Sequence, residues 1–244
     1  MQDERPQVGL LFPGEMGAAV GNAVRGEVLW ASEGRSEATR GRAAAFEDVG
    51  SVAELVRASE IVLSICPPAI AEEVAEQVFG LGFDGIYVEA NAISPERMRR
   101  IAKLGSHVVD GSIIGARGIS LYLAGEDAQE VAGLFTDDEV RPIDLEAEVG
   151  AASALKMAFG GWNKIGIALT AQAHEIARAY GVAEWLDREG VPPDRLPRVA
   201  DRAWRWAPEM EEVAETCREL GVSDGIARGA ADAYRNVSRA VRRS

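Results

Sequence analysis

The stretch that decides the fold is VGLLFPGEMGAAVG, residues 8–21. Its opening run, residues 8–12, is apolar and predicts a buried strand. A glycine-containing turn follows, and residues 14–25 carry apolar side chains at helical spacing. A strand that runs directly into such a turn and helix points free backbone N–H groups and the positive helix end at one place. A pyrophosphate group fits that place, so the stretch is typical of a dinucleotide-binding fold.

The glycines of this turn follow the fingerprint G-x-G-x-x-G only in part. Gly14 and Gly17 match its second and third glycines, but Phe12 stands at the first and Pro13 follows it. Because a residue before proline favours extended backbone, we expect Phe12 to be extended. The residues predicted to bind the cofactor in this turn are Pro13, Gly14, Glu15, Met16 and Gly17. A strand-to-helix turn that binds no ligand is the alternative interpretation.

Strand and helix patterns alternate along the first half of the chain. Further apolar runs predict strands at 27–31, 60–65, 85–90, 107–115, 119–125 and 140–145. Helical patterns fall between them, at 51–59, at 68–78 and from residue 94. This alternation predicts an α/β fold with a Rossmann-like, doubly wound and mostly parallel sheet.

The pattern changes near residue 150, after which no strand is predicted. A long helix over 150–182, which Gly160 and Gly161 are expected to weaken, precedes shorter ones at 182–189, 193–206, 208–220 and 223–242. Proline and glycine residues, Pro208 among them, separate these helices. We therefore predict a dinucleotide-binding domain at 1–148 and a small all-α domain at 149–244 that begins with a long interdomain helix.

Charge and composition exclude several classes of function. The 244 residues carry a net charge of −13, divided into −14 for residues 1–150 and +1 for the rest. The acidic half repels phosphate backbones, so no nucleic-acid partner is expected. No apolar run is long enough for a membrane span, and MQDERPQ lacks a signal-peptide core, which predicts a cytoplasmic protein without a membrane partner. Cys66 and Cys217 are too few to predict a disulfide framework or a metal site.

Polar residues after the second predicted strand bear on the choice of cofactor. In WASEGRSEATRGR, residues 30–42, the side chains of Ser32, Arg35 and Ser36 can donate to a 2′-phosphate, which favours NADP over NAD. Glu33 favours NAD instead, because an acidic residue there accepts hydrogen bonds from the ribose hydroxyls of NAD. Arg40 and Arg42 are either further phosphate partners or the solvated face of a helix.

Five motifs in a fixed order carry a family resemblance: residues 8–21, CPP at 66–68, EANAISP at 89–95, VDGSIIG at 109–115, and Lys156. Together they resemble the β-hydroxyacid dehydrogenase superfamily, which includes 6-phosphogluconate and 3-hydroxyisobutyrate dehydrogenases and the imine reductases. The chain looks most like the branch that joins such an NAD-binding domain to a short, uncharacterised helical C-terminal domain.

The resemblance implies hydride transfer between NAD(P) and a small polar oxo or hydroxy acid, and the residues after the second predicted strand favour NADPH as the form used. It implies cofactor contacts for Cys66, Pro67 and Asn91, substrate contacts for Ser112, Ile113 and Gly115, and a proton-transferring role for Lys156. It also implies a homodimer. Taken without the resemblance, Cys66 reads as a small buried residue, Asp110 and Ser112 as strand-end hydrogen-bonding groups, and Lys156 as a surface lysine.

The pattern breaks after Lys156. The dehydrogenases place an asparagine one helical turn later, where this chain has Phe159 and Gly160. Asn163 lies two turns after Lys156 on nearly the same face, and we predict that it takes a displaced substrate-binding role. Contact with solvent or a partner subunit is the alternative for Asn163. Lys164 points about 80° away from Lys156 on the helix and is a rival.

Other residues of the second half read as packing groups. His174 is expected in the core or an interface, and Trp185, Trp204 and Trp206 are expected to anchor the small domain, with a cleft or dimer contact as the alternative. Two further functions remain as alternatives to the NADPH-dependent dehydrogenase. One is imine reduction, and the other is a nucleotide-binding module without catalysis, which Phe12, Pro13 and the missing asparagine favour.

Overall fold

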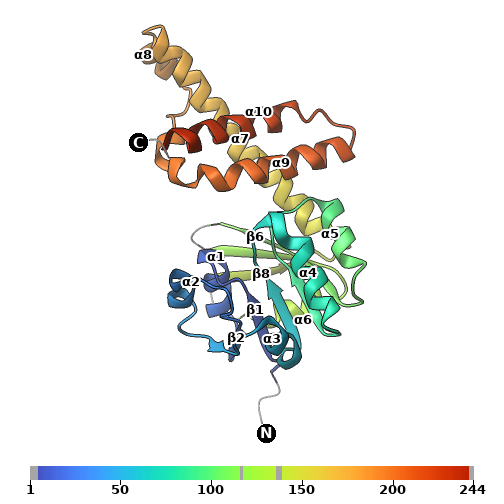
Figure 1. Cartoon of the computed structure of the whole chain (residues 1–244). Helices are drawn as coiled ribbons and strands as arrows, with labels where there is room; N and C mark the ends of the chain where they lie inside the picture. Colours follow the sequence, from blue (N-terminus) through green and yellow to red (C-terminus); the bar gives the residue numbers. More distant parts are fainter. Residues whose placement is uncertain (1–4, 116–117, 136–138, 242–244) are drawn as a thin grey trace. The chain divides into compact units, whose positions relative to one another are not determined.

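The computed structural model describes residues 5–115, 118–135 and 139–241. The chain divides into two compact units, Met1–Lys156 and Met157–Ser244. The first holds the strands and the second is helical (Figure 1). None of the described helices combines the length and the apolar character that crossing a bilayer requires.

The first unit is built on one eight-stranded sheet. Its strands are β1 (Val8–Leu11), β2 (Val28–Trp30), β3 (Glu47–Asp48), β4 (Ile61–Ser64), β5 (Ile86–Glu89), β6 (Val108–Ile114), β7 (Ile119–Ala124) and β8 (Val140–Asp144). They lie in the order β3-β2-β1-β4-β5-β6-β7-β8. The strands from β3 to β6 pair in parallel, and β7 pairs antiparallel to β6 and parallel to β8. The predicted mostly parallel, doubly wound sheet is confirmed.

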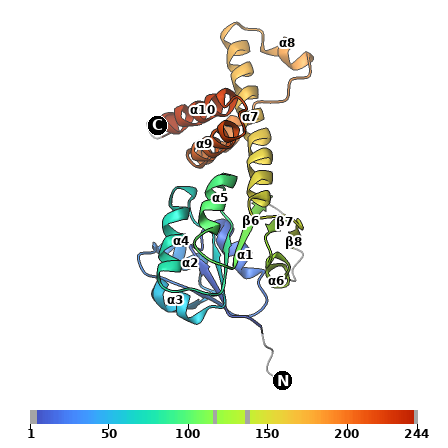
Figure 2. The same cartoon turned by 90° about the vertical axis from the view of Figure 1, so that its right-hand side faces the viewer.

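Helices cover both faces of this sheet (Figure 2). Residues of α1 (Glu15–Asn22) and α6 (Ala128–Ala132) share one apolar cluster with the strands. The other cluster contains residues of α3 (Val52–Ala58), α4 (Ala71–Gly80) and α5 (Pro95–Ala102). Because each face is buried, β1, β4 and β5 are buried at every residue, which explains why most of their residues are apolar.

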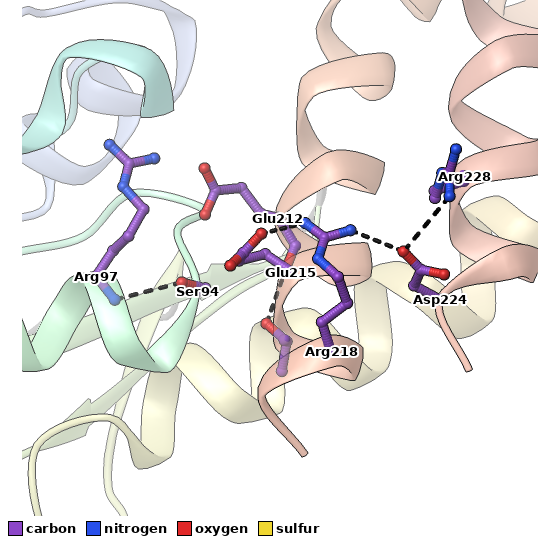
Figure 3. A network of polar contacts seen from close by, with 8 residues as sticks. Ser94, Arg97, Glu212, Glu215, Arg218, Asp224 and Arg228 are labelled. Carbon is purple, nitrogen blue, oxygen red and sulfur yellow. Dashed lines mark hydrogen bonds and ion pairs between the residues drawn. The ribbon is translucent and has the colours of Figure 1, made fainter. Parts of the chain in front are cut away.

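Polar caps set where several helices begin. Ser51 accepts a hydrogen bond from the Glu54 amide at the start of α3, and Ser94 accepts one from the Arg97 amide at the start of α5 (Figure 3). Ser36 caps α2 (Glu37–Arg42) in the same way. No sequence pattern predicted β3, and a helix at α2 was only one of the two interpretations of Arg40 and Arg42, because both elements are short and carry no buried apolar face. The predicted helix over 68–78 begins as a 3-10 turn, η1 (Pro68–Ile70).

The second unit consists of helices. They are the continuation of α7 (Ala151–Ala179), α8 (Ala183–Arg188), the 3-10 segment η2 (Leu196–Arg202), α9 (Ala203–Glu219) and α10 (Gly225–Val241). Gly160 and Gly161, which are expected to weaken α7, do not interrupt it, since α7 is one continuous helix (Figure 2). A Cβ atom at Gly161 would lie 3.2 Å from Val213 Cγ1, and one at Gly160 would lie 2.9 Å from Glu209 Oε1. Because these two glycines have no side chains, α9 can pack closely against α7.

The predicted helix break at Pro208 is also wrong, because α9 runs through this residue. Proline removes one helical hydrogen bond and costs about 3 kcal/mol in a helix interior. Ala207, Met210, Val213 and Ala214 bury one face of α9, and this packing outweighs the loss.

Helices α9 and α10 form an antiparallel pair. Arg218 near the end of α9 bonds to Glu215 and, at 2.7 Å, to Asp224, which also lies 3.9 Å from Arg228 (Figure 3). These ion pairs surround the turn between the two helices.

The tryptophans of the second unit divide into two kinds. Trp206 packs edge-on against the buried Tyr234, with ring centroids 5.2 Å apart, as expected for an anchor. The same expectation is wrong for Trp185 and Trp204, whose side chains are 61% and 60% exposed. Each instead has an arginine beside its ring, Arg188 and Arg205 respectively.

Candidate functional site

The order of the strands locates the candidate site. The chain leaves β1 toward β2 on one side, and β4 lies on the other side of β1, so the crossover direction reverses between β1 and β4. In open α/β sheets, ligands bind at the carboxyl ends of the strands beside such a reversal. The loops after β1, β2, β4 and β5 begin at this edge, and they carry most of the predicted cofactor residues.

The turn after β1 has an unexpected backbone. Phe12 has φ 59°, so the expected extended conformation is wrong. The Gly14 amide donates to the Phe12 carbonyl at 2.7 Å, closing a tight turn around Pro13 before α1 begins. This closure explains the conformation, because the chain must reverse within these residues. A non-glycine residue in the left-handed region costs on the order of 1–3 kcal/mol, which the surrounding structure must offset.

The two glycines of the turn have different functions in the fold. A Cβ atom at Gly17 would lie 2.9 Å from the Phe12 carbonyl oxygen, so Gly17 permits close packing of α1 on the turn. A Cβ atom at Gly14 would have no neighbour nearer than 4.0 Å. Gly14 precedes the first helical residue, Glu15, and no side chain caps the helix. The open space beside Gly14 therefore adjoins N–H groups at the positive helix end.

Three arginines lie after β2, and the structure separates them. Arg40 donates to the Ser32 carbonyl at 2.9 Å, and Arg42 donates to the Pro13 carbonyl at 3.3 Å. Arg35 places its guanidinium carbon 3.8 Å from the centre of the Phe12 ring. Burial lowers the pKa of Arg35, while the nearby Cys66 and Glu33 oppose that shift. Arg40 and Arg42 thus donate hydrogen bonds to backbone oxygens, whereas the Arg35 guanidinium lies over the Phe12 ring.

The two predicted serines are placed differently. Ser32 is buried, and its amide donates to Asp48 Oδ1 at 3.2 Å. The hydrogen bond from the Ser32 side chain is the main cause that lowers the pKa of Asp48. Ser36 is exposed, and its hydroxyl contacts the Thr39 hydroxyl at 3.1 Å. Glu33 is exposed beside Arg35.

A buried polar cluster follows β4 and β5. The Asn91 side-chain amide donates to Cys66 Sγ at 3.2 Å and to Glu89 Oε1. The Tyr87 hydroxyl donates to Glu89 Oε2 at 3.2 Å, and the Asn91 backbone amide donates to Oε1 at 3.2 Å. Pro67 next to Cys66 is exposed. The structure thus brings Cys66 and Asn91 together, and it adds Glu89, which sequence reasoning missed.

The signal for Glu89 was present in the sequence. It is the acidic end of the apolar run IYVE, and a charged residue completing a buried strand is unusual. Its side chain is 1% exposed, and burial raises its pKa to about 8. Burial also raises the pKa of Cys66 to about 12. Cys66 is therefore a neutral, buried thiol, as the interpretation without a family predicted.

Hydrogen bonds join β6 to the start of α7. Asp110 accepts from the amides of Gly150 and Ser153, each at 2.9 Å, and from the Ser153 hydroxyl at 2.7 Å. Ser112 is buried, and its hydroxyl donates to the Ala152 carbonyl at 2.7 Å. Both residues are hydrogen-bonding groups that fix the first turn of the helix, although they lie within β6 and not at its end.

Lys156 lies on the next turn of α7. Its ammonium donates to the Ile113 carbonyl at 2.5 Å, so the lysine faces the end of β6. Gly115 follows with φ 114°, in a region where only glycine is unstrained, and its Cβ position lies 2.9 Å from the Gly118 carbonyl. The structure thus brings Lys156, Ser112, Ile113 and Gly115 into one region. Residues 116–117 lie outside the described structure.

Asn163 belongs to the second unit. It lines a cavity of about 310 Å³ together with Trp162, Gly166, Ile167, Thr170, Pro192, Pro193 and Arg195. Lys164, the rival of Lys156, is paired with Glu209 at 2.5 Å, and its carbonyl accepts from Tyr234. His174 is buried, and its Nε2 lies 2.8 Å from the Pro192 carbonyl. Lys164 and His174 are thus committed to packing.

Part of the helical second unit matches a known protein family. Residues 177–237 match the family model described as "Domain of unknown function (DUF1932)". This match agrees with the predicted resemblance to a branch with a short, uncharacterised helical C-terminal domain. No curated protein sequence matches the chain significantly.

Solved structures resemble the whole chain. A conserved protein of unknown function, described as structurally similar to 3-hydroxyacid dehydrogenases, is 26% identical, with a TM-score of 0.70 over 95% of this chain and 97% of that one. A Mycobacterium tuberculosis 3-hydroxyisobutyrate dehydrogenase with L-serine is 15% identical, with a TM-score of 0.71 over 96% and 94%. An Aspergillus terreus reductive aminase in complex with NADPH4, cyclohexanone and allyl amine is 18% identical, with a TM-score of 0.56 over 98% and 94%.

These similarities confirm the predicted resemblance to the β-hydroxyacid dehydrogenase superfamily and its short-domain branch. At these identities the more distant structures show the fold alone. The residues of the candidate site carry the functional argument.

Proposed function

We propose that the chain is an NAD(P)-dependent oxidoreductase that prefers NADPH and acts on a small polar oxo or hydroxy compound. The observation that carries the proposal is the pair of features at the edge between β1 and β4. Open space beside Gly14 adjoins the positive end of α1, and the Arg35 guanidinium lies across the neighbouring turn. A pyrophosphate and a 2′-phosphate need these two features.

The residues present fit such a cofactor. The backbone from Pro13 to Gly17 would hold the pyrophosphate, and Arg35 with Ser36 would hold the 2′-phosphate. Cys66, Pro67 and Asn91 would border the nicotinamide half. A nicotinamide bound there supplies the hydride. Ser32, which is turned toward Asp48, would contribute through its place in the loop.

Lys156 is proposed to transfer the proton. Its ammonium lies 2.5 Å from the Ile113 carbonyl, at the strand end predicted to bind the substrate. An ammonium there stabilises negative charge that develops on a carbonyl oxygen and then donates its proton, and the neutral amine removes that proton in the reverse direction. Because the Ser112 hydroxyl already donates to Ala152, the amides from Ile113 to Gly115 are the better donors for the substrate's acid group.

Imine reduction is the second candidate function. It is favoured by Phe159, which stands one helical turn after Lys156 where the dehydrogenases have an asparagine, and is 39% exposed. An apolar side chain suits a less acidic acceptor better than it suits a hydroxy acid. The proposed substrate role of Asn163 is compatible with both functions, since the cavity that it lines contains both the apolar ring of Trp162 and the charged side chain of Arg195.

The proposed assembly is a homodimer formed through α7. Apolar or small residues recur along one stripe of this helix at alternating spacings of three and four: Phe159, Trp162, Gly166, Leu169, Ala173, Ile176 and Tyr180. Trp162 is 75% exposed, Leu169 65% and Tyr180 81%. This spacing is the coiled-coil pattern, in which a second helix with the same stripe interlocks with the first. A two-fold axis would bring α7 of a second copy onto this stripe.

The test compares two lysine variants on a panel of small oxo acids and imines with NADPH. Lys156→Met should lower kcat at least a hundredfold, the usual scale of lost acid–base catalysis, while NADPH binds within about twofold of the wild type. Lys103→Met, at an exposed lysine, is the control and should match the wild type. Full turnover of imines by Lys156→Met would favour imine reduction, and NADPH binding without turnover of any compound would favour a non-catalytic module.

A further inference from the structure

The backbone conformation of Phe12 is unfavourable for two reasons. Its φ of 59° lies in the left-handed region, and a proline follows it. A glycine would adopt this backbone without strain and would complete the glycine fingerprint. A phenylalanine at this position therefore needs a compensating interaction, which the chain around the turn should reveal.

The interaction lies across the candidate cofactor site. The Phe12 ring, on the turn after β1, is stacked by the Arg35 guanidinium from the loop after β2, with 3.8 Å between guanidinium carbon and ring centre. Arginine on an aromatic face is stabilised by the charge distribution of the ring and by contact of two flat groups. Arg42 also joins the two loops, donating to the Pro13 carbonyl at 3.3 Å.

The stack leaves the hydrogen-bonding edge of the guanidinium available. Within the part of the chain that the structure describes, the Arg35 guanidinium has no hydrogen-bond acceptor, whereas Arg40 and Arg42 both donate to carbonyl oxygens. A guanidinium with one face covered and its N–H edge open matches the requirement for binding a phosphate through paired hydrogen bonds. The ring also removes rotamer freedom from Arg35 before a ligand arrives.

We propose that Phe12 is a specificity-determining residue, which positions Arg35 for the 2′-phosphate and so sets the preference for NADPH over NADH. Phe12 acts through Arg35 and contacts no reacting atom. This inference rests on the proposed function, because it requires a dinucleotide at this edge of the sheet. It also explains why phenylalanine replaces the first glycine of the fingerprint. The turn loses an unstrained backbone and gains an aromatic ring against which Arg35 packs.

The experiment measures the dissociation constants of NADPH and NADH by calorimetry for the full chain and its variants. Phe12→Leu removes the ring but keeps an apolar side chain, and Phe12→Tyr keeps the ring face. We expect Phe12→Leu to weaken NADPH about three- to tenfold and NADH by less than twofold, the scale of one cation–π contact. Phe12→Tyr should retain the preference of the wild type.

Two further variants separate positioning from a structural effect. In an Arg35→Ala background, which lacks the guanidinium, Phe12→Leu should change NADPH affinity no further. Phe12→Gly relaxes the backbone and removes the ring, so it should reduce the NADPH preference to the same extent as Phe12→Leu. Retention of the preference in Phe12→Leu or Phe12→Gly, or an undiminished effect of Phe12→Leu without Arg35, would overturn the inference.

The outcomes distinguish this inference from the function on which it rests. Wild-type protein that binds neither nucleotide contradicts both. Wild-type protein that prefers NADPH, together with Phe12 variants that keep this preference, contradicts only the role of Phe12. Thermal unfolding of each variant identifies any that fails to fold, and Phe12→Tyr then provides the comparison with the ring present.

Discussion

At the scale of single residues, Glu89 is the group whose environment departs furthest from what its type suggests. It ends β5 inside the sheet, takes hydrogen bonds from Tyr87 and Asn91, and faces the buried Asp110 on the neighbouring strand. Its position gives Asn91 a fixed orientation, because both hydrogen atoms of the Asn91 side-chain amide are used by Glu89 and Cys66. The amide oxygen of Asn91 is then the atom left to accept a hydrogen bond at the edge of the sheet where we propose that the cofactor binds.

The raised pKa of Glu89 predicts how stability depends on pH. The folded protein keeps the proton of Glu89 up to a pKa of about 8, whereas the unfolded chain releases it near the ordinary value of 4.5. Between those values the folded state binds more protons, so the contribution of Glu89 to the free energy of unfolding falls as pH rises, by up to about 1.4 kcal/mol per pH unit.

Urea unfolding of the wild type and Glu89→Gln between pH 5 and 8 measures this contribution. As pH rises, the free energy of unfolding of Glu89→Gln should increase relative to that of the wild type, because glutamine has no proton to release. Parallel pH profiles for the two proteins would contradict the buried, protonated state of Glu89.

At the scale of elements, the glycines of α7 and α10 differ in what surrounds them. A Cβ atom at Gly161 would lie 3.2 Å from Val213 Cγ1 of α9, whereas a Cβ atom at Gly229 of α10 would meet nothing within 4 Å. Gly161→Leu should therefore destabilise the second unit by about 1–3 kcal/mol through overpacking. Gly229→Ala should stabilise it by about 0.5–1 kcal/mol through helix propensity. Equal effects of the two substitutions in chemical denaturation would contradict the close packing of α9 on α7.

The elements also show how far the sequence leads. The buried strands and long helices were predictable because their apolar runs and periodicity are strong. The helix α2 and strand β3 were not, since neither carries a buried apolar face. The break expected at Pro208 was wrong because local propensity was weighed without the tertiary packing of α9 that overrides it. The close approach of Gly161 to Val213 was not predictable, since the two residues are distant in sequence.

The candidate site was predictable in its positions but less so in its contacts. Motif order indicated the loops after β1, β2, β4 and β5. The stack of Arg35 on Phe12 and the bonding of Ser112 to Ala152 join residues distant in sequence, which no local pattern encodes. The left-handed Phe12 was missed because the rule for residues before proline was applied without the tight turn that Gly14 closes.

At the scale of the whole molecule, the exposed stripe of α7 predicts a dimer that polar substitution disrupts. Leu169→Glu with Ile176→Glu places like charges at the centre of the proposed interface and should yield a monomer at micromolar concentration. Glu175→Gln, at an exposed polar position of the same helix, is the control. Light scattering measures the mass of each protein. A wild-type monomer, or a double variant that remains dimeric, would contradict the α7 interface.

We propose that the edge between β1 and β4 binds NADPH with its 2′-phosphate on Arg35. Calorimetric titration of NADPH and NADH into the wild type and Arg35→Ala tests it most directly. We expect the wild type to bind NADPH at least tenfold more tightly than NADH, a difference of about 1.4 kcal/mol, and Arg35→Ala to bind both with similar affinity. Tighter binding of NADH would assign the ribose to Glu33 instead, and binding of neither nucleotide would contradict the account.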